Sequence, residues 1–526
     1  MSLSTSPLTS RPKLPPQIPF IIGNEACERF SFYGMRNVLT VFLTGYLLAD
    51  IADEPQRQAA AKDVFHVFVM GVYFFPLLGG WISDKLWGKY RTIFWISLLY
   101  CVGHACLALF ESNKEGFYLG LFLIALGSGG IKPCVSSFVG DQFDQSNKHL
   151  ARVVFDAFYW IINFGSFFAS LLIPLVLKSW GPAWAFGIPG ILMGIATLVF
   201  WAGRHKYVVV PPSPADPNSF LRIARTALLS LGSDGKRPGL ILTLMGLVLA
   251  LASLALIPAL GVVAGLCLGL VVFMVPFCVG LGVQLERARG KHPDEDVDGV
   301  RAVLRVLVVF ALVTPFWSLF DQKASTWVLQ AKEMALPGWE WLQSPSQMQA
   351  LNPLLVMLLI PFNNLLLYPL LRKVGVEPTP LRRMTFGMAC AGISWIVVGS
   401  MQLSMDGGDK LSILWQVLPY LVLTFGEVLV SATGLEFAYS QAPAKMKSVL
   451  MSFWSLAVTV GNLWVLLVNA TVRGEGATAA IKQTGLGVTA FQMFFFAGFA
   501  FVAAAAFGVY ARRYRVVDYY RATTSK

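Results

Sequence analysis

Apolar stretches long enough to cross a membrane recur along almost the whole 526-residue sequence. We count about fourteen of them, at 18–48, 64–82, 92–110, 117–139, 154–177, 183–202, 238–259, 262–284, 302–320, 350–371, 384–403, 412–437, 447–470 and 489–511. Hydrocarbon offers no water to backbone polar groups, so each stretch has to satisfy its own hydrogen bonds as an α-helix. None shows the alternation of a barrel strand. The chain is therefore predicted to be an all-α polytopic membrane protein.

Composition and charge support this prediction. Hydrophobic residues make up 56% of the chain and charged residues only 13%, which excludes an ordinary soluble domain. The net charge of +12 comes from basic residues in every second loop, such as Lys85, Lys89 and Arg91, and not from a basic aromatic surface that would bind nucleic acid. By the positive-inside rule, both termini are expected in the cytoplasm.

The N-terminus and the cysteines carry no further signal. Residues before Ile18 lack a charged-then-apolar leader with a cleavage site, so the first helix itself is expected to direct insertion. All seven cysteines fall in predicted spans without metal-type spacing. We predict that they pack in the core, and that the protein holds no metal.

The predicted spans divide the chain into three parts. Six lie in 1–207, and prolines then end the first half. Residues 208–300 contain two uncharged, Leu- and Gly-rich spans, and 301–526 contain six more. Two six-helix bundles joined by an inserted hairpin resemble the architecture of major-facilitator transporters. The loop Gly80 to Arg91 also resembles that superfamily's G-x-x-x-D-(R/K)-x-x-G-(R/K) loop, which implies a gating role for Asp84.

The first span contains charges at membrane depth. Glu25, Glu28, Arg29, Tyr33 and Arg36 are separated by three, one, four and three residues, so they form one polar stripe on a helix. Because an intramembrane charge costs a few kcal/mol even on lenient scales, the stripe predicts substrate or proton handling. A packed structural ion pair is the alternative.

The same segment carries a family signature. Glu25-x-x-Glu28-Arg29-Phe30-x-Phe32-Tyr33-Gly34 resembles the E-x-x-E-R-F-x-Y-Y-G motif of the proton-coupled oligopeptide transporter family, with Phe32 in place of one tyrosine. Further segments resemble the family's other signatures in the same order: 127–133, 140–143, 158–166, 316–322, 352–353, 426–427 and 434–443. The resemblance covers the chain outside 208–300, which itself is similar to the extra helix pair of prokaryotic members. It implies an integral protein of the bacterial cytoplasmic (inner) membrane.

This resemblance implies three sets of site residues. The proton-coupling set is Glu25, Glu28, Arg29, His66 and Asp321. The substrate-binding set is Arg29, Tyr33, Lys132, Asn163, Trp317, Asn352, Glu427, Trp454 and Ser455. The gating set is Arg36, Asp321, Lys132, Glu427 and Asp84. For the aromatic residues core packing is the alternative, and for the ion pairs it is a purely structural role.

Two gates follow from the same resemblance. Asp321 is expected to pair with Arg36 near His66, whose unperturbed pKa suits a proton switch, on the extracellular side. Lys132 and Glu427 are expected to form the corresponding pair toward the cytoplasm. A second intramembrane histidine, His104, matches no motif and is predicted to be a satisfied core residue.

The predicted function is proton-driven import of di- and tripeptides by alternating access. Arg29 and Lys132 suit the peptide carboxylate, and Glu427 suits its amine. Protons are the coupling ion and no cofactor is expected, nor is an obligate protein partner or enzymatic chemistry; lipids surround the protein. The rival interpretations are a nitrate- or anion-moving relative, whose plant-type members often lack the E-x-x-E-R carboxylates, and a peptide sensor, which would be expected to carry a cytoplasmic signalling domain.

Overall fold

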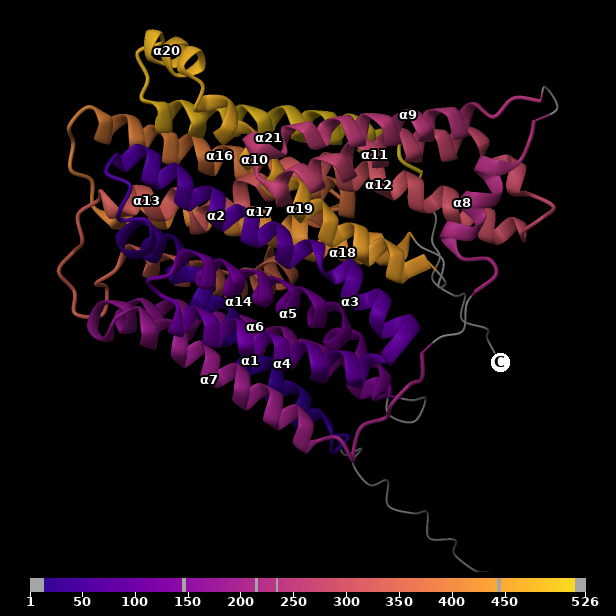
Figure 1. The fold of residues 1–526 in the computed structure, drawn as a ribbon, viewed down its shortest axis with the longest axis horizontal. Coiled ribbons are helices and arrows are strands. Elements are labelled where there is room, and N and C mark those ends of the chain that lie inside the picture. Colours follow the sequence, from indigo (N-terminus) through magenta and orange to yellow (C-terminus); the bar gives the residue numbers. More distant parts are fainter. Residues whose placement is uncertain (1–13, 144–147, 213–215, 233–234, 442–445, 516–526) are drawn as a thin grey trace, which may run out of the picture.

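The computed structural model describes residues 14–143, 148–212, 216–232, 235–441 and 446–515, whose regular structure is helical (Figure 1). The predictions about an N-terminal leader and about the side on which the termini lie concern the first 13 and last 11 residues, which are outside the described ranges.

The first bundle consists of the helices that precede the proline-rich linker. They are α1 (Ile18–Phe42), α2 (Glu54–Phe74), α3 (Pro76–Ile82), α4 (Lys89–Leu109), α5 (Lys114–Asp141), α6 (Lys148–Trp180) and α7 (Pro182–Ala202). Their buried apolar side chains form one core, with α1 packed against α6 and α7. Pro76 begins α3 and interrupts the spanning segment after α2, since proline cannot donate to the preceding turn.

The second bundle consists of the helices after the hairpin, and it has a core of its own. They are α12 (Asp294–Asp321), α13 (Thr326–Lys332), α14 (Leu351–Phe362), α15 (Tyr368–Lys373), α16 (Pro380–Asp406), α17 (Val417–Glu427), α18 (Thr433–Ser440), α19 (Lys447–Val472), α20 (Glu475–Gln483) and α21 (Val488–Arg513). A 3₁₀ turn, Gln322–Ala324, separates α12 from α13 within the spanning segment Asp294–Lys332. This break places polar side chains inside the bundle.

The segment between the bundles contains α8 (Phe220–Leu229), α9 (Pro238–Ser253), α10 (Ile257–Leu260) and α11 (Val262–Gln284). Only 11% of the apolar window of α9 and 22% of that of α11 is buried inside the molecule, against 61% for α5. The hairpin therefore presents most of its apolar surface to lipid, as its uncharged sequence predicts. Its inner side packs on α2 and α19 through a small cluster that includes Met70, Cys267 and Leu463.

Thirteen helical segments of the described residues are long and apolar enough to cross a membrane. Helix α1 is not among these thirteen segments. It has 25 residues, four of them charged, and we count it as a further spanning helix because it packs along α6 and α7 within the first bundle. The all-α membrane fold predicted from the apolar stretches is confirmed.

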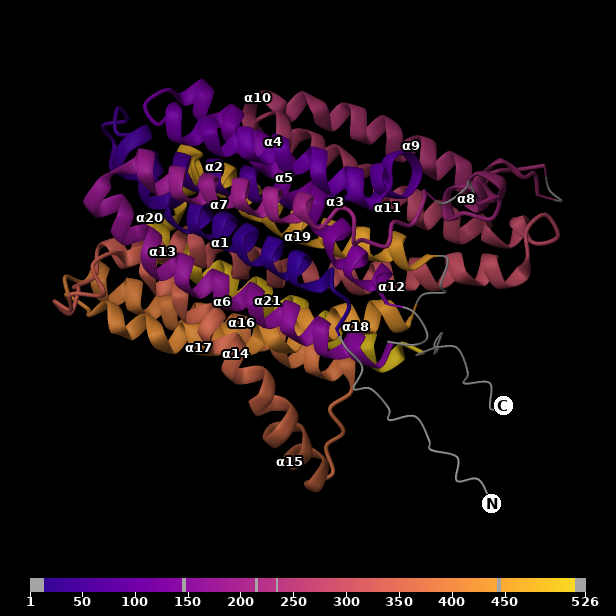
Figure 2. The ribbon, with the colours of Figure 1, turned by 90° about the horizontal axis from the view of Figure 1, so that it is seen from below.

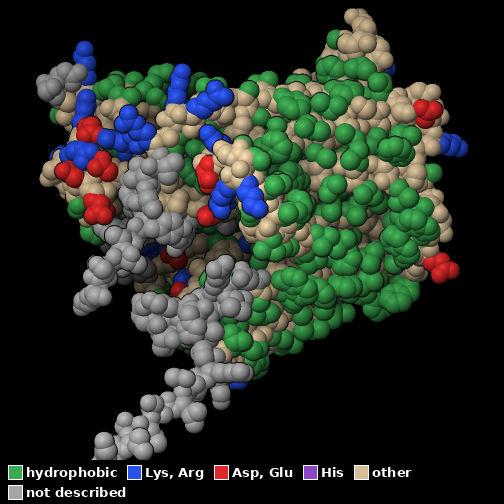
Figure 3. Space-filling model, turned by 180° about the vertical axis from the view of Figure 1, so that it is seen from behind, with side chains coloured by type: hydrophobic (Ala, Val, Ile, Leu, Met, Phe, Trp, Pro, Cys, Tyr) green, Lys and Arg blue, Asp and Glu red, His purple; other side chains and the backbone are tan. Residues whose placement is uncertain are grey.

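The two bundles lie side by side with their helices roughly parallel to one long direction (Figures 1 and 2). We call the end at which the described chain begins and stops the terminal end; it lies at the right of Figure 1. The opposite end, which carries α20, is the distal end. Apolar side chains cover the sides of the molecule, and charged side chains gather toward the two ends (Figure 3).

Candidate functional site

Helix α1 buries the charged cluster of the sequence motif. Arg29 Nε lies 3.0 Å from Glu25 Oε1 and 2.5 Å from Glu28 Oε2, and none of the three residues is more than 4% exposed. The helical spacing alone brings them together. Two carboxylates around one guanidinium leave an excess negative charge, which in a buried site requires a further cation or a bound proton.

Lys132 supplies a cation from the neighbouring helix α5. Its Nζ lies 4.4 Å from the centre of the Tyr73 ring, and its charge acts on both Glu25 and Glu28. Tyr33 lies within electrostatic range of both Lys132 and Arg29. The structure therefore brings together three residues that the sequence assigned to substrate binding.

Helix α6 approaches this cluster closely at a glycine. A Cβ on Gly165 would lie 3.2 Å from the Ala26 carbonyl oxygen, so a larger residue would push α6 away from α1. Asn163 lies on the same part of α6, and its Nδ2 donates to the Tyr159 carbonyl oxygen at 3.0 Å. Tyr159, 46% exposed, interacts electrostatically with both Tyr33 and Glu427, although the sequence analysis did not select it.

Glu427 of α17 faces the first bundle from the opposite side. Asn352 Nδ2 donates to Glu427 Oε2 at 2.5 Å and to Thr424 Oγ1 at 3.1 Å. Its amide oxygen accepts from Lys323 Nζ at 2.9 Å. Asn352 thus bridges a cation and a carboxylate, which fixes the orientation of its amide and holds both charged groups near the interface.

Lys323 is a site residue that the sequence analysis missed. It is only 4% exposed, it acts electrostatically on both Glu427 and Asp321, and its Nζ lies 3.2 Å from the Phe320 ring centre. The available signal was a lysine just after the Phe316–Gln322 motif, at the point where the 3₁₀ turn interrupts the span. A charge at a helix break in a membrane span is a default functional candidate.

The predicted pair between Arg36 and Asp321 joins the two bundles. Arg36 Nη2 donates to Asp321 Oδ1 at 2.8 Å, and the two residues are 6% and 2% exposed. The Arg36 guanidinium also lies 5.2 Å from the centre of the Phe65 ring. The second oxygen, Asp321 Oδ2, accepts from Asn462 Nδ2 at 2.8 Å. Both carboxylate oxygens of this buried acid are therefore satisfied.

His66 reaches this pair through one intermediate residue. Its Nδ1 lies 2.6 Å from Asn462 Oδ1 and its Nε2 lies 2.9 Å from Ser325 Oγ, so the ring contacts both α19 and the turn before α13. Asn462 connects His66 to Asp321, and the sequence analysis did not identify it. His104, in contrast, lies within the first bundle, where Nε2 is 2.9 Å from Ser31 Oγ.

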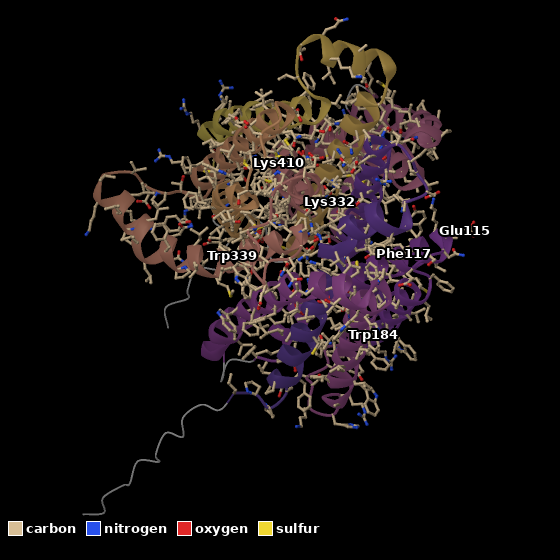
Figure 4. The ribbon with its side chains drawn as sticks, turned by 90° about the vertical axis from the view of Figure 1, so that its left-hand side faces the viewer. Glu115, Phe117, Trp184, Lys332, Trp339 and Lys410 are labelled. Carbon is tan, nitrogen blue, oxygen red and sulfur yellow. The ribbon has the colours of Figure 1, made fainter. Side chains whose placement is uncertain are left out.

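Further hydrogen bonds between the bundles cluster toward the distal end. Thr40 Oγ1 donates to the Ala324 carbonyl oxygen at 2.7 Å, and Lys332 Nζ donates to Thr44 Oγ1 at 3.1 Å. Gln349 Nε2 donates to the Asn37 carbonyl oxygen at 2.8 Å. Figure 4 looks onto this end, with the second bundle, including Lys332, meeting the first. The distal side is closed in this conformation.

The terminal side differs. Figure 3 shows the surface hollowed between the two bundles near this end, with charged atoms in the hollow. Lys132 interacts with the α1 cluster, and among the described contacts none joins it to Glu427, whose partners are Asn352 and Lys323. The expected Lys132–Glu427 gate is therefore not formed here, because the bundles are apart on this side. It stays a prediction for a conformer closed at the terminal end.

The predicted gating loop around Asp84 forms a π-helical turn, Ser83–Trp87. Lys89 Nζ donates to both oxygens of Asp141, at 2.8 and 2.7 Å, and so ties the start of α4 to the end of α5. Asp84 lies within electrostatic range of Lys85 and Lys89 but is not the direct ion-pair partner of Lys89. The ion pair that joins these helix ends therefore uses Asp141, a residue of the 140–143 motif for which the sequence predicted no role.

The remaining residues of the predicted substrate-binding set lie in the second bundle. The Trp317 and Trp454 rings are 5.9 Å apart and nearly perpendicular, at 6% and 9% exposure, so each packs in the core as well as near the interface. Ser455 follows on α19 and is partly buried. No group of three His, Cys, Asp or Glu side chains within the described ranges is arranged as a metal site. The site is one of paired charges, amides and aromatic rings from two bundles.

Comparisons with known proteins agree with this geometry. The model of the POT family, PTR2, matches residues 90–485. Peptide transporter 3 of Caenorhabditis elegans is 32% identical over 409 residues, which are 74% of this chain and 51% of that protein. Solute carrier family 15 member 2 of Mus musculus is 31% identical over 436 residues, 76% of this chain and 51% of that protein. The chain thus spans about half the length of these relatives.

Two crystal structures match nearly end to end. An auto-inhibited POT family peptide transporter is 65% identical, with a TM-score of 0.94 over 97% of this chain and 99% of that one. The POT family transporter PepTSo is also 65% identical, with a TM-score of 0.93 over 95% of this chain and 99% of that one. With most of its length inside the family match and the motif residues gathered between two helix bundles, the chain belongs to the POT family.

Proposed function

We propose that the protein is a proton-coupled symporter that carries di- and tripeptides across the membrane by alternating access. The observation that supports this proposal is that each bundle holds its own set of polar side chains: Arg29 and Lys132 in the first bundle, Glu427 and Asn352 in the second. Tyr159 of the first bundle interacts electrostatically with Glu427 of the second. The names of the relatives support the substrate class, since several are peptide transporters.

A peptide of any sequence carries a carboxylate at one end and an ammonium group at the other. Arg29 offers a planar fork for the carboxylate, and Lys132 a second positive charge beside it. Glu427 accepts from the ammonium group, and Asn352 and Asn163 add neutral hydrogen bonds. Tyr33, Trp317, Trp454 and Ser455 are proposed to shape the walls. Because only the two ends are held by charge, the side chains of the peptide can vary.

Proton coupling is proposed to use the acids that hold the bundles or the α1 cluster together. Glu25 and Glu28 share Arg29, so a proton or the peptide carboxylate changes the balance of this cluster. Asp321 holds Arg36 at the closed side, and His66 contacts it through Asn462. Protonation of Asp321 removes the charge that retains Arg36, which favours opening at the distal end.

The proposal includes the orientation and the organisation of the chain. The terminal end is assigned to the cytoplasm of a bacterial inner membrane, since the basic loops lie there, and the distal end to the outside. The moving units are 1–207 and 301–526, and 208–300 is a lipid-facing insertion. The conformation described is then inward-open, with Arg36, Asp321 and His66 forming the outer gate.

Uptake of a labelled dipeptide into proteoliposomes tests this function. We expect accumulation only with the outside acid or the inside negative, and its loss when a protonophore collapses the gradient. Accumulation that persists with the protonophore would refute proton coupling. Nitrate uptake without dipeptide uptake would favour the anion-moving relative, and dipeptide binding without any flux would favour a sensor.

The orientation of the peptide is tested by Glu427→Gln. This variant is expected to weaken competition by peptides with a free amine at least tenfold, and competition by N-acetylated peptides much less, because one charge-assisted hydrogen bond is worth roughly 1.5–3 kcal/mol. Glu340→Gln, a change of the same kind on an exposed distal loop, is the matched control. Equal loss for both peptide classes would contradict the proposed orientation.

A further inference from the structure

A second ion pair crosses between the bundles at the distal rim. Arg473, at the end of α19, donates through Nη2 to Asp63 Oδ2 of α2 and to the Ala59 carbonyl oxygen, the latter at 3.3 Å. Asn469 Nδ2 donates to the other oxygen, Asp63 Oδ1, at 3.3 Å. The side chains of Arg473 and Asp63 are 46% and 29% exposed, so water and salt reach this pair.

The pair is part of a polar chain that extends to α21. Gln492 Nε2 lies 3.4 Å from Asn469 Oδ1, and Gln492 Oε1 accepts from Lys62 Nζ at 3.5 Å. Lys62 is 9% exposed and precedes Asp63 on α2. Two adjacent side chains of the first bundle are thus held by α19 and α21 of the second.

The position of this chain relates it to the deeper gate. Asp63 lies one helical turn before His66 on α2, and Asn469 lies two turns after Asn462 on α19. The contact between Asp63 and Arg473 therefore lies outside the contact between His66 and Asn462 along the same pair of helices. The bundles cannot part at the distal end around the deeper gate without also separating this outer pair.

We propose that Asp63 and Arg473 form an outer clasp that sets the equilibrium between distal-closed and distal-open conformers. The inference rests on the alternating access of the proposed function. When the bundles part, both side chains pass fully into water. The clasp therefore stabilises the closed conformer by the interaction free energy of one partly exposed ion pair. Such pairs change an equilibrium by about 1.5- to fivefold, and salt screens them.

The clasp is tested by measuring distances across the distal rim in the full chain. Spin labels are placed on cysteines that replace Gln56, at the start of α2, and Gln483, at the end of α20, both exposed, after the native cysteines are replaced by alanine. Asp63→Asn keeps an acceptor for Asn469 and removes the charge. We expect it to raise the ratio of separated to close labels about 1.5- to fivefold in lipid nanodiscs.

A matched pair at the same end provides the control. Lys114 Nζ donates to both oxygens of Asp50, but both residues belong to the first bundle, so Asp50→Asn should leave the ratio unchanged. Arg473→Gln should act like Asp63→Asn, and the double variant no more strongly than either. Added salt should open the parent and the Asp50→Asn protein, with a smaller effect on Asp63→Asn.

The proposal is overturned if Asp63→Asn changes the ratio no more than Asp50→Asn, or if the effects of the two single changes add in the double variant. Dipeptide uptake by the parent is measured separately. Failure of uptake would argue against the proposed function, whereas uptake by the parent with no effect of Asp63→Asn on the label distances would argue against the clasp alone.

Discussion

Replacing Asp321 by asparagine removes a charge on which the closed distal side depends. In the structure its two carboxylate oxygens accept from Arg36 and from Asn462, each at 2.8 Å, and Arg36 is only 6% exposed. An amide has one oxygen for these two donors and no charge for the guanidinium. A charge-assisted hydrogen bond is worth about 1.5–3 kcal/mol, and stripping one partner from a buried pair costs about 3–5 kcal/mol.

Asparagine keeps one acceptor and a similar shape, so the cost should be below that of a fully unpaired buried charge. We expect the distal-closed conformer to lose about 2–3 kcal/mol of stabilisation. In the open conformer water solvates Arg36, so the loss applies to one side of the equilibrium. The ratio of open to closed molecules should then rise about 30- to 150-fold. Protonation of the native acid removes the same charge, so Asp321→Asn should also abolish most of the response to pH.

Spin-label distances between positions 56 and 483, measured from neutral to acid pH, test this reasoning. The parent should show a growing separated population as the pH falls, and Asp321→Asn should show that population throughout. Peptide binding from the distal side should survive in the variant while gradient-driven accumulation fails. If the distances in the variant follow pH as those in the parent do, Asp321 is not the switch, and Glu25 and Glu28 become the acids to examine.

Three further predictions address coupling, recognition and packing. Glu25→Gln should abolish gradient-driven uptake in proteoliposomes while leaving some gradient-free exchange; equal loss of both would indicate a purely structural charge. Lys132→Ala should weaken peptides with a free carboxylate at least tenfold more than C-terminal amides in competition assays, and no difference between them would contradict its role. Gly79→Ala should lower the thermal midpoint of unfolding, because its Cβ would lie 2.0 Å from the Gly130 carbonyl oxygen and overpacking costs about 1–3 kcal/mol or more. Gly80→Ala is the control: nothing lies within 4 Å of its Cβ, so the midpoint should not change.

Contacts within one helix were predictable because helical periodicity determines them. The spacing of Glu25, Glu28 and Arg29 requires that they share a face, and the structure has the two ion pairs that follow. The number of spanning helices was predictable for a related reason, since each apolar stretch has to close its own backbone hydrogen bonds in lipid. The pair between Arg36 and Asp321 was predictable only through the family resemblance, because 285 positions separate them.

Partners between helices depended on how the bundles are rotated and tilted against each other. The sequence did not show that Asn462 reaches His66 or that Lys323 reaches Asn352, because these partners come from other helices. Lys89 pairs with Asp141 and not with Asp84, since the ends of α4 and α5 meet in space. The conformation is also a tertiary property, because two packings of the same helices can differ by a few kcal/mol. The sequence by itself determined the helices and the charges on each face, and the packing of the bundles decided which charges meet.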